Sequence, residues 1–144
     1  MKIVLCGSLS FVEEIKRIKE QIIAKGHEAL LPAALEELSL KNSDDVAKLK
    51  NDRKRYFRIK PNYMKKHFDK ILSSDAILVV NLEKNGIKNY IGGNTFAEIM
   101  FAFYYNKKVF FLNPIPNNDK LSHMIEEVEA VKPIILNGNL DLIK

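Results

Sequence analysis

Short runs of apolar residues alternate with longer amphipathic stretches along most of the chain. The apolar runs have the length of buried β-strands and occupy residues 2–6, 28–32, 76–81, 108–112 and 133–136. Between them, apolar residues recur every three or four positions and predict helices over residues 10–25, 62–73, 95–105 and 119–131. This alternation is typical of an α/β fold, so we expect a five-stranded parallel sheet with right-handed crossovers.

The first helix has clear local signals at both of its ends. Ser10 is the expected N-cap, and Glu13, three residues later, is the expected partner in a capping box. Gly26 follows a lysine and ends the helix in the manner of a C′ glycine. Strand, helix, glycine and strand in this order predict a βαβ unit at the start of the chain.

Residues 33–60 are less regular and are predicted to be a basic helical insertion in a single domain of 144 residues. Residues 33–38 and 44–57 can each form a helix. Pro61 is expected to begin the next helix, because the first turn of a helix tolerates a proline.

The positive charge of the chain is concentrated in one stretch. Residues 48–70 contain ten Lys or Arg against two Asp, a net charge of +8, whereas the remaining residues carry a net charge of −3. Such a stretch is either a solvated helix face or a surface that attracts phosphates and other polyanions. No nucleic-acid-binding motif accompanies it, so nucleic acid is not the expected partner.

Composition excludes several classes of protein. Hydrophobic residues make up 47% of the chain, but no apolar run approaches the ~20 residues of a membrane span. No separate signal segment precedes the first strand, so we expect a cytoplasmic protein. Cys6 is the single cysteine, and His27, His67 and His123 lie far apart, so we expect no disulfide, no metal and no cofactor.

Candidate chemistry lies where the predicted strands end, since ligands of parallel sheets bind beyond the carboxyl ends of the strands. This rule indicates Gly7-Ser8, Asn81 and Asn113. A second candidate is the stretch Gly92-Gly93-Asn94-Thr95-Phe96-Ala97-Glu98. Asn94 or Thr95 is expected to cap the next helix, which places Glu98 in its first turn, near the positive end of the helix dipole.

Four short stretches follow one another in a characteristic order and spacing. They are the opening strand and Gly-Ser turn over 3–9, the helix and strand over 67–80, the glycine loop and helix over 93–109, and Leu-Ser-His-Met-Ile over 121–125. Together they resemble the nucleoside 2-deoxyribosyltransferase superfamily, and most closely the 2′-deoxynucleoside 5′-phosphate N-hydrolases. The resemblance extends from residue 2 to about residue 131, with residues 32–60 outside it.

The resemblance implies a flavodoxin-like (Rossmann-like) three-layer sandwich and an enzyme that cleaves N-glycosidic bonds through a glutamate nucleophile. By this match Glu98 is the nucleophile, and His67 stands where the family places an aspartate, so it is the expected acid–base partner. The residues expected to bind substrate are Gly7, Ser8, Gly92, Gly93 and Asn94. In the hydrolases the serine that matches Ser122 contacts the 5′-phosphate from the neighbouring subunit, which implies a nucleotide substrate and a homodimer.

Several positions depart from the family pattern. Gly92 stands where the hydrolases have serine and the transferases have aspartate, and Asn94 replaces a glycine. The leading hypothesis is base release from a nucleoside 5′-monophosphate. The alternatives are a 2-deoxyribosyltransferase that exchanges bases and a non-catalytic nucleotide-binding or sensor domain. A nucleic-acid binder that uses residues 48–70 is the weakest hypothesis.

The same residues also admit purely structural interpretations. Glu98 fits a capping box with Thr95, and His67 fits an exposed histidine within a lysine cluster. Cys6 fits a small buried residue without a base partner. The aromatic cluster over 101–105 fits core packing or a subunit contact.

Overall fold

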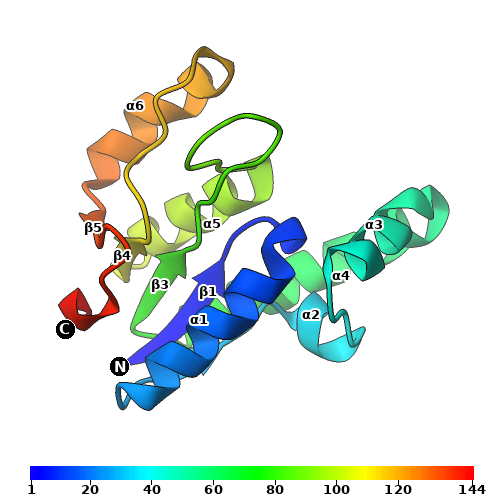
Figure 1. The fold of residues 1–144 in the computed structure, drawn as a ribbon, viewed down its shortest axis with the longest axis horizontal. Coiled ribbons are helices and arrows are strands. Elements are labelled where there is room, and N and C mark those ends of the chain that lie inside the picture. Colours follow the sequence, from blue (N-terminus) through cyan, green and yellow to red (C-terminus); the bar gives the residue numbers. More distant parts are fainter.

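The computed structural model describes residues 1–144 and contains one sheet of five parallel strands (Figure 1). The strands are β1 (Lys2–Cys6), β2 (Glu28–Leu30), β3 (Ala76–Val79), β4 (Lys108–Phe111) and β5 (Ile134–Ile135). Their order across the sheet is β2-β1-β3-β4-β5, which is the flavodoxin-like order. The predicted α/β fold and its five-stranded parallel sheet are therefore confirmed.

Six α-helices and three short 3₁₀-helices accompany the strands. The α-helices are α1 (Val12–Ala24), α2 (Ala33–Glu37), α3 (Ser43–Asn51), α4 (Arg53–Leu72), α5 (Gly93–Tyr104) and α6 (Ser122–Val131). The 3₁₀-helices are η1 (Leu9–Phe11), η2 (Asp119–Leu121) and η3 (Leu140–Leu142). None of the helices combines the length and the apolar character needed to cross a membrane.

An apolar core lies on each face of the sheet, which makes the fold a three-layer sandwich. In β1, Ile3 and Leu5 join the core that contains the buried face of α1, whereas Val4 joins the core that contains residues of α4, α5 and α6. The division follows from strand geometry, because successive side chains point to opposite faces. Strands that are buried on both faces need apolar residues at every position, which explains the unbroken apolar runs in the sequence.

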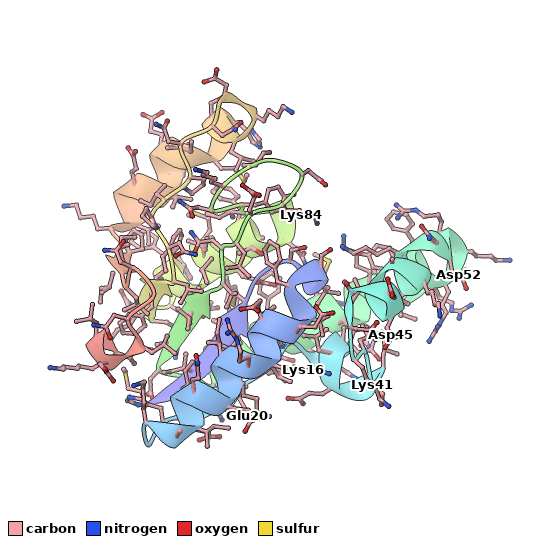
Figure 2. The ribbon with its side chains drawn as sticks, viewed as in Figure 1. Lys16, Glu20, Lys41, Asp45, Asp52 and Lys84 are labelled. Atoms are coloured by element: carbon pink, nitrogen blue, oxygen red, sulfur yellow. The ribbon has the colours of Figure 1, made fainter.

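The helical insertion differs from its prediction at residue 52. Residues 44–57 do not form one helix, because α3 ends before Asp52 and α4 begins after it. The Asp52 carboxylate accepts a hydrogen bond from the backbone N–H of Arg55 at 3.2 Å and so caps α4. In Figure 2, Asp52 lies at the far end of the α3–α4 pair, which extends away from the sheet. The capping residue therefore turns the chain back towards the sheet.

Helix α4 also begins earlier than the sequence predicts. Pro61 lies inside the helix instead of in its first turn, because α4 continues unbroken from Arg53 to Leu72. A proline inside a helix removes the hydrogen bond to the carbonyl four residues earlier. That residue is Phe57, which is itself exposed.

The predicted capping box of the first helix is wrong. Ser8, not Ser10, supplies the cap: its hydroxyl accepts the backbone N–H of Ser10 at 3.3 Å and begins η1, which leads into α1. Glu13 instead accepts a hydrogen bond from the backbone N–H of Ser43 at 2.8 Å. This bond is the main cause of the lowered pKa of Glu13, and it joins α1 to the start of α3.

Candidate active site

A cavity of about 260 Å³ opens beyond the carboxyl ends of β1 and β3. Its walls come from the turn after β1, helices α2, α3 and α4, the loop after β3 and the beginning of α5. The cavity is lined by seven of the predicted site residues, namely Gly7, Ser8, His67, Gly92, Gly93, Asn94 and Glu98. Ser122 does not line it, and lies exposed at the start of α6.

Glu98 lies in the second turn of α5, one turn further along than predicted. The helix begins at Gly93 with Gly92 as its N-cap, and the carbonyl of Gly92 accepts the backbone N–H of Phe96 at 2.9 Å. Asn94 and Thr95 are therefore inside the helix and do not cap it. Since a capping box needs Thr95 as the N-cap, that interpretation of Glu98 is wrong. Its side chain is instead buried, with 7% exposure, and lines the cavity.

His67 is the partner that the fold brings to Glu98. It lies on the buried face of α4 and is 4% exposed, so the exposed-histidine interpretation is wrong. Its Nε2 atom lies 3.6 Å from Oε1 of Glu98. Its other ring nitrogen, Nδ1, is buried and has no hydrogen-bond partner. A titratable nitrogen beside a carboxylate in a cavity can exchange a proton with a bound molecule.

Cys6 completes the buried group at the end of β1. Its Sγ atom lies 3.4 Å from Nε2 of His67, so a base does lie beside the thiol, contrary to the sequence interpretation. Burial raises the pKa of the Cys6 thiol well above its ordinary value of 9.0, and the Glu98 carboxylate raises it further. Cys6 therefore stays protonated at neutral pH and is a poor nucleophile, because the reactive form is the thiolate.

Cys6, His67 and Glu98 are also the residues that can hold a metal ion. Their ligand atoms all lie within 4.8 Å of one another, and all three side chains are buried. The spacing of the histidines along the sequence gives no sign of this group, because each of its members comes from a different element.

The turn after β1 approaches the neighbouring strand closely. A Cβ atom on Gly7 would lie 2.9 Å from the backbone carbonyl oxygen of Val80, which is closer than side-chain carbons come to backbone. Only glycine therefore fits at this position without a backbone shift. The next residue, Ser8, accepts a hydrogen bond from Nζ of Lys84 at 2.9 Å, which links the turn to the loop after β3.

The other predicted polar positions at this edge do not join the cavity. Asn81 and Asn113 bond to each other, with the Asn113 backbone N–H donating to the Asn81 side-chain oxygen at 2.9 Å. The side-chain NH₂ of Asn81 donates to the carbonyls of Asn113 and Pro114, at 3.0 and 2.9 Å. These residues fasten the loops after β3 and β4 together, and their role is structural.

Sequence reasoning missed several residues that line the cavity. Lys50 comes from α3, Lys60 from α4 and Lys84 from the loop after β3, and all three reach the same cavity as Glu98. Lys50 and Lys60 belong to the basic stretch over residues 48–70, but the sequence pattern did not distinguish them from lysines that form surface ion pairs. Lys66 pairs with Glu37 at 2.8 Å and Lys70 with Glu36 at 3.4 Å.

Comparison with known proteins bears on the fold. No family model matches the chain, and no curated protein sequence matches it. Among solved structures, it is similar to a 2-deoxyribosyltransferase from the psychrotolerant bacterium Bacillus psychrosaccharolyticus, with a TM-score of 0.56 and 14% sequence identity. The alignment covers 94% of this chain and 98% of that chain. The two proteins therefore share one fold over nearly their whole length.

Proposed function

We propose that this protein cleaves the N-glycosidic bond of a nucleoside 5′-monophosphate and releases the base. The observation that carries the proposal is a buried carboxylate, Glu98, that lines a cavity and lies 3.6 Å from the ring nitrogen of His67. A nucleophile and a proton carrier in one enclosed site are what this reaction needs. The shared fold with a 2-deoxyribosyltransferase supports the same chemistry.

The first half of the reaction forms a covalent intermediate. An oxygen of Glu98 attacks the anomeric carbon of the sugar, and the bond from that carbon to the base nitrogen breaks. The electron pair of this bond goes to the base, which takes a proton from Nε2 of His67. The sugar is then held as an ester on Glu98, as in a retaining glycosidase.

The second half restores the enzyme. Water attacks the anomeric carbon on the opposite face, and its proton passes to Nε2 of His67. The ester bond breaks, the electron pair returns to the Glu98 carboxylate, and the sugar phosphate leaves. Splitting one difficult displacement into two steps is the usual advantage of covalent catalysis.

Base exchange is the second candidate, and the solved structure of a 2-deoxyribosyltransferase is the observation that favours it. In that reaction a second base takes the place of water and attacks the same intermediate. In this proposal the second base would bind in the same cavity of about 260 Å³ that Glu98 lines. A non-catalytic sensor domain is the outcome if neither reaction occurs.

One experiment separates the three functions. The protein is incubated with a panel of nucleosides and nucleoside 5′-monophosphates, with and without a second free base, and the products are separated by chromatography. Release of free base without formation of a new nucleoside or nucleotide supports hydrolysis. Formation of a nucleoside or nucleotide that carries the second base supports transfer. Binding without either product contradicts both enzymatic proposals. Intact mass spectrometry after rapid acid quench tests the mechanism. The wild type should carry the mass of one sugar phosphate adduct, and Glu98→Ala should not.

We further propose that the protein acts as a homodimer. The support is an exposed aromatic cluster at the end of α5, where Phe103, Tyr104 and Tyr105 are 52%, 76% and 43% exposed. Large exposed aromatic side chains are enriched at subunit contacts. Sedimentation equilibrium of the wild type and of Tyr104→Ser tests this proposal.

A further inference from the structure

Three lysines from separate elements converge on the cavity that holds Glu98. Lys50 lies near the end of α3, Lys60 lies in α4, and Lys84 lies in the loop after β3. None of the three forms an ion pair, in contrast to Lys66 and Lys70 further along α4. Glu98 is the only acidic residue that lines the cavity. The lysines therefore outnumber the one carboxylate of the cavity, and none of them is paired with it.

The arrangement is electrostatically unfavourable in the absence of a ligand. Partial burial lowers the pKa of Lys50, and repulsion from Lys84, Lys60 and Arg53 lowers it further. Burial also lowers the pKa of Lys84. Like charges gathered in a partly desolvated cavity destabilise one another, and a bound anion relieves that repulsion.

Two of these ammonium groups are held in place by neighbouring side chains. Nζ of Lys84 donates to the hydroxyl of Ser8 at 2.9 Å and lies 5.2 Å from the centre of the Tyr90 ring. Nζ of Lys60 lies 5.2 Å from the centre of the Tyr56 ring. Figure 2 shows Lys84 in the loop that faces the turn after β1. Groups that are already positioned lose less conformational entropy when they bind a ligand.

We propose that Lys50, Lys60 and Lys84, together with the Ser8 hydroxyl, form a phosphate subsite within a single chain. A phosphomonoester carries a charge of about −1.5 to −2 at neutral pH and three acceptor oxygens, which match convergent ammonium donors. Glu98 and the three lysines line one cavity, so a nucleotide bound with its anomeric carbon at Glu98 would extend its phosphate toward the lysines. The proposal uses none of the contacts expected from Ser122, which lies outside the cavity.

This inference rests on the proposed function only for the placement of the sugar. Steady-state base release is measured for a nucleoside 5′-monophosphate and for its nucleoside, with the wild type, Lys84→Met and Lys50→Met. Losing one charge-assisted hydrogen bond should raise KM for the nucleotide by roughly 10-fold or more. The kcat for the nucleotide and both constants for the nucleoside should change little. Lys48→Met and Lys88→Met are matched controls, because both lysines are exposed and lie outside this cavity.

An equal effect on nucleoside and nucleotide would overturn the subsite and give these lysines a structural role. A larger rise in the nucleotide KM for Ser122→Ala than for Lys84→Met would also overturn it, since the phosphate would then be bound at α6.

A binding experiment separates this proposal from the proposed function. Isothermal titration calorimetry of Glu98→Gln with a nucleoside 5′-monophosphate and with inorganic phosphate measures the subsite without turnover. Lysine-dependent binding to Glu98→Gln, together with no base release by the wild type, supports the subsite and contradicts the proposed function. Base release with binding that is independent of the lysines supports the proposed function and contradicts the subsite.

Discussion

Two polar clusters lie at the same edge of the sheet and differ in how completely their hydrogen bonds are satisfied. At the ends of β3 and β4, the side chain of Asn81 forms hydrogen bonds with the backbone of Asn113, and the side chain of Asn113 donates to the backbone carbonyl of Asn81. At the end of β1, His67 and Glu98 lie 3.6 Å apart, and Nδ1 of His67 has no partner. Buried polar groups in folded proteins are normally paired, which is why the proposed ligand site is placed at the unsatisfied cluster.

The largest effect is expected from Glu98→Gln. The amide has nearly the shape of the carboxylate but cannot act as the nucleophile, so base release should fall by roughly 10⁴-fold or more. The measurement is kcat/KM for the best nucleotide of the panel. Glu83→Gln, an exposed substitution in the loop after β3, is the control and should keep full activity. Retention of activity by Glu98→Gln would remove Glu98 from the mechanism.

Removal of the proton carrier should have a smaller effect. His67→Gln keeps a polar side chain of similar length but carries no proton for the leaving base, so kcat should fall by roughly 10²–10⁴-fold. His67→Asp should retain more activity than His67→Gln, because a carboxyl group can also carry a proton. The ratio of the two variants is the measurement. Equal activities would mean that His67 serves only to pack α4 against α5.

Substitution in the Asn81–Asn113 cluster should lower the stability of the protein and leave its catalysis unchanged. Asn81→Ala leaves partly buried backbone groups of Asn113 and Pro114 without partners, which should lower the free energy of unfolding by about 1–2 kcal/mol. Urea denaturation measures this loss, and base release per folded molecule should stay at the wild-type value. Asn117→Ala, an exposed position in the loop after β4, is the control. Loss of activity in folded Asn81→Ala would show that both clusters belong to the active site.

The smallest expected effect concerns Cys6 and depends on pH. Its pKa is raised in the folded state, so the unfolded chain loses the thiol proton first as the pH rises past 9.0. Stability from this residue is therefore complete below pH 9 and falls above it, by at most ~1.4 kcal/mol per pH unit. Cys6→Ala should remove this slope and lower stability at pH 7 by about 1 kcal/mol. Thermal unfolding midpoints from pH 7 to pH 10 test this, and an unchanged slope in Cys6→Ala would contradict it.

Much of the fold can be predicted from the sequence, because its signals are local. Each strand of a doubly covered sheet is a short apolar run, and the helices between them keep one apolar face. Capping was predicted less well. Ser10 and Thr95 have the right side chains for capping, but α1 and α5 begin after Phe11 and Gly92, neither of which makes a side-chain cap bond, and Ser8 caps only the short η1. Several residues near a helix start can act as caps, and packing against the sheet decides where the helix begins.

The candidate site could be predicted only in part. Glu98 and the glycines around it stand in one continuous stretch, and the family resemblance indicated His67 as its partner. Neither source placed Cys6 beside His67, because 61 residues separate them in the chain and no local pattern links them. Nor did they distinguish Lys50 and Lys60, which line the cavity, from Lys66 and Lys70, which pair with acids on α2.

The sequence by itself determined the α/β class, the positions of the strands and the stretch that contains Glu98, because short-range patterns encode these features. The tertiary structure alone decided that His67 is buried, that α4 continues through Pro61, and that three lysines surround one cavity. Contacts between distant residues depend on how the helices pack on the sheet, and packing is a property of the whole chain.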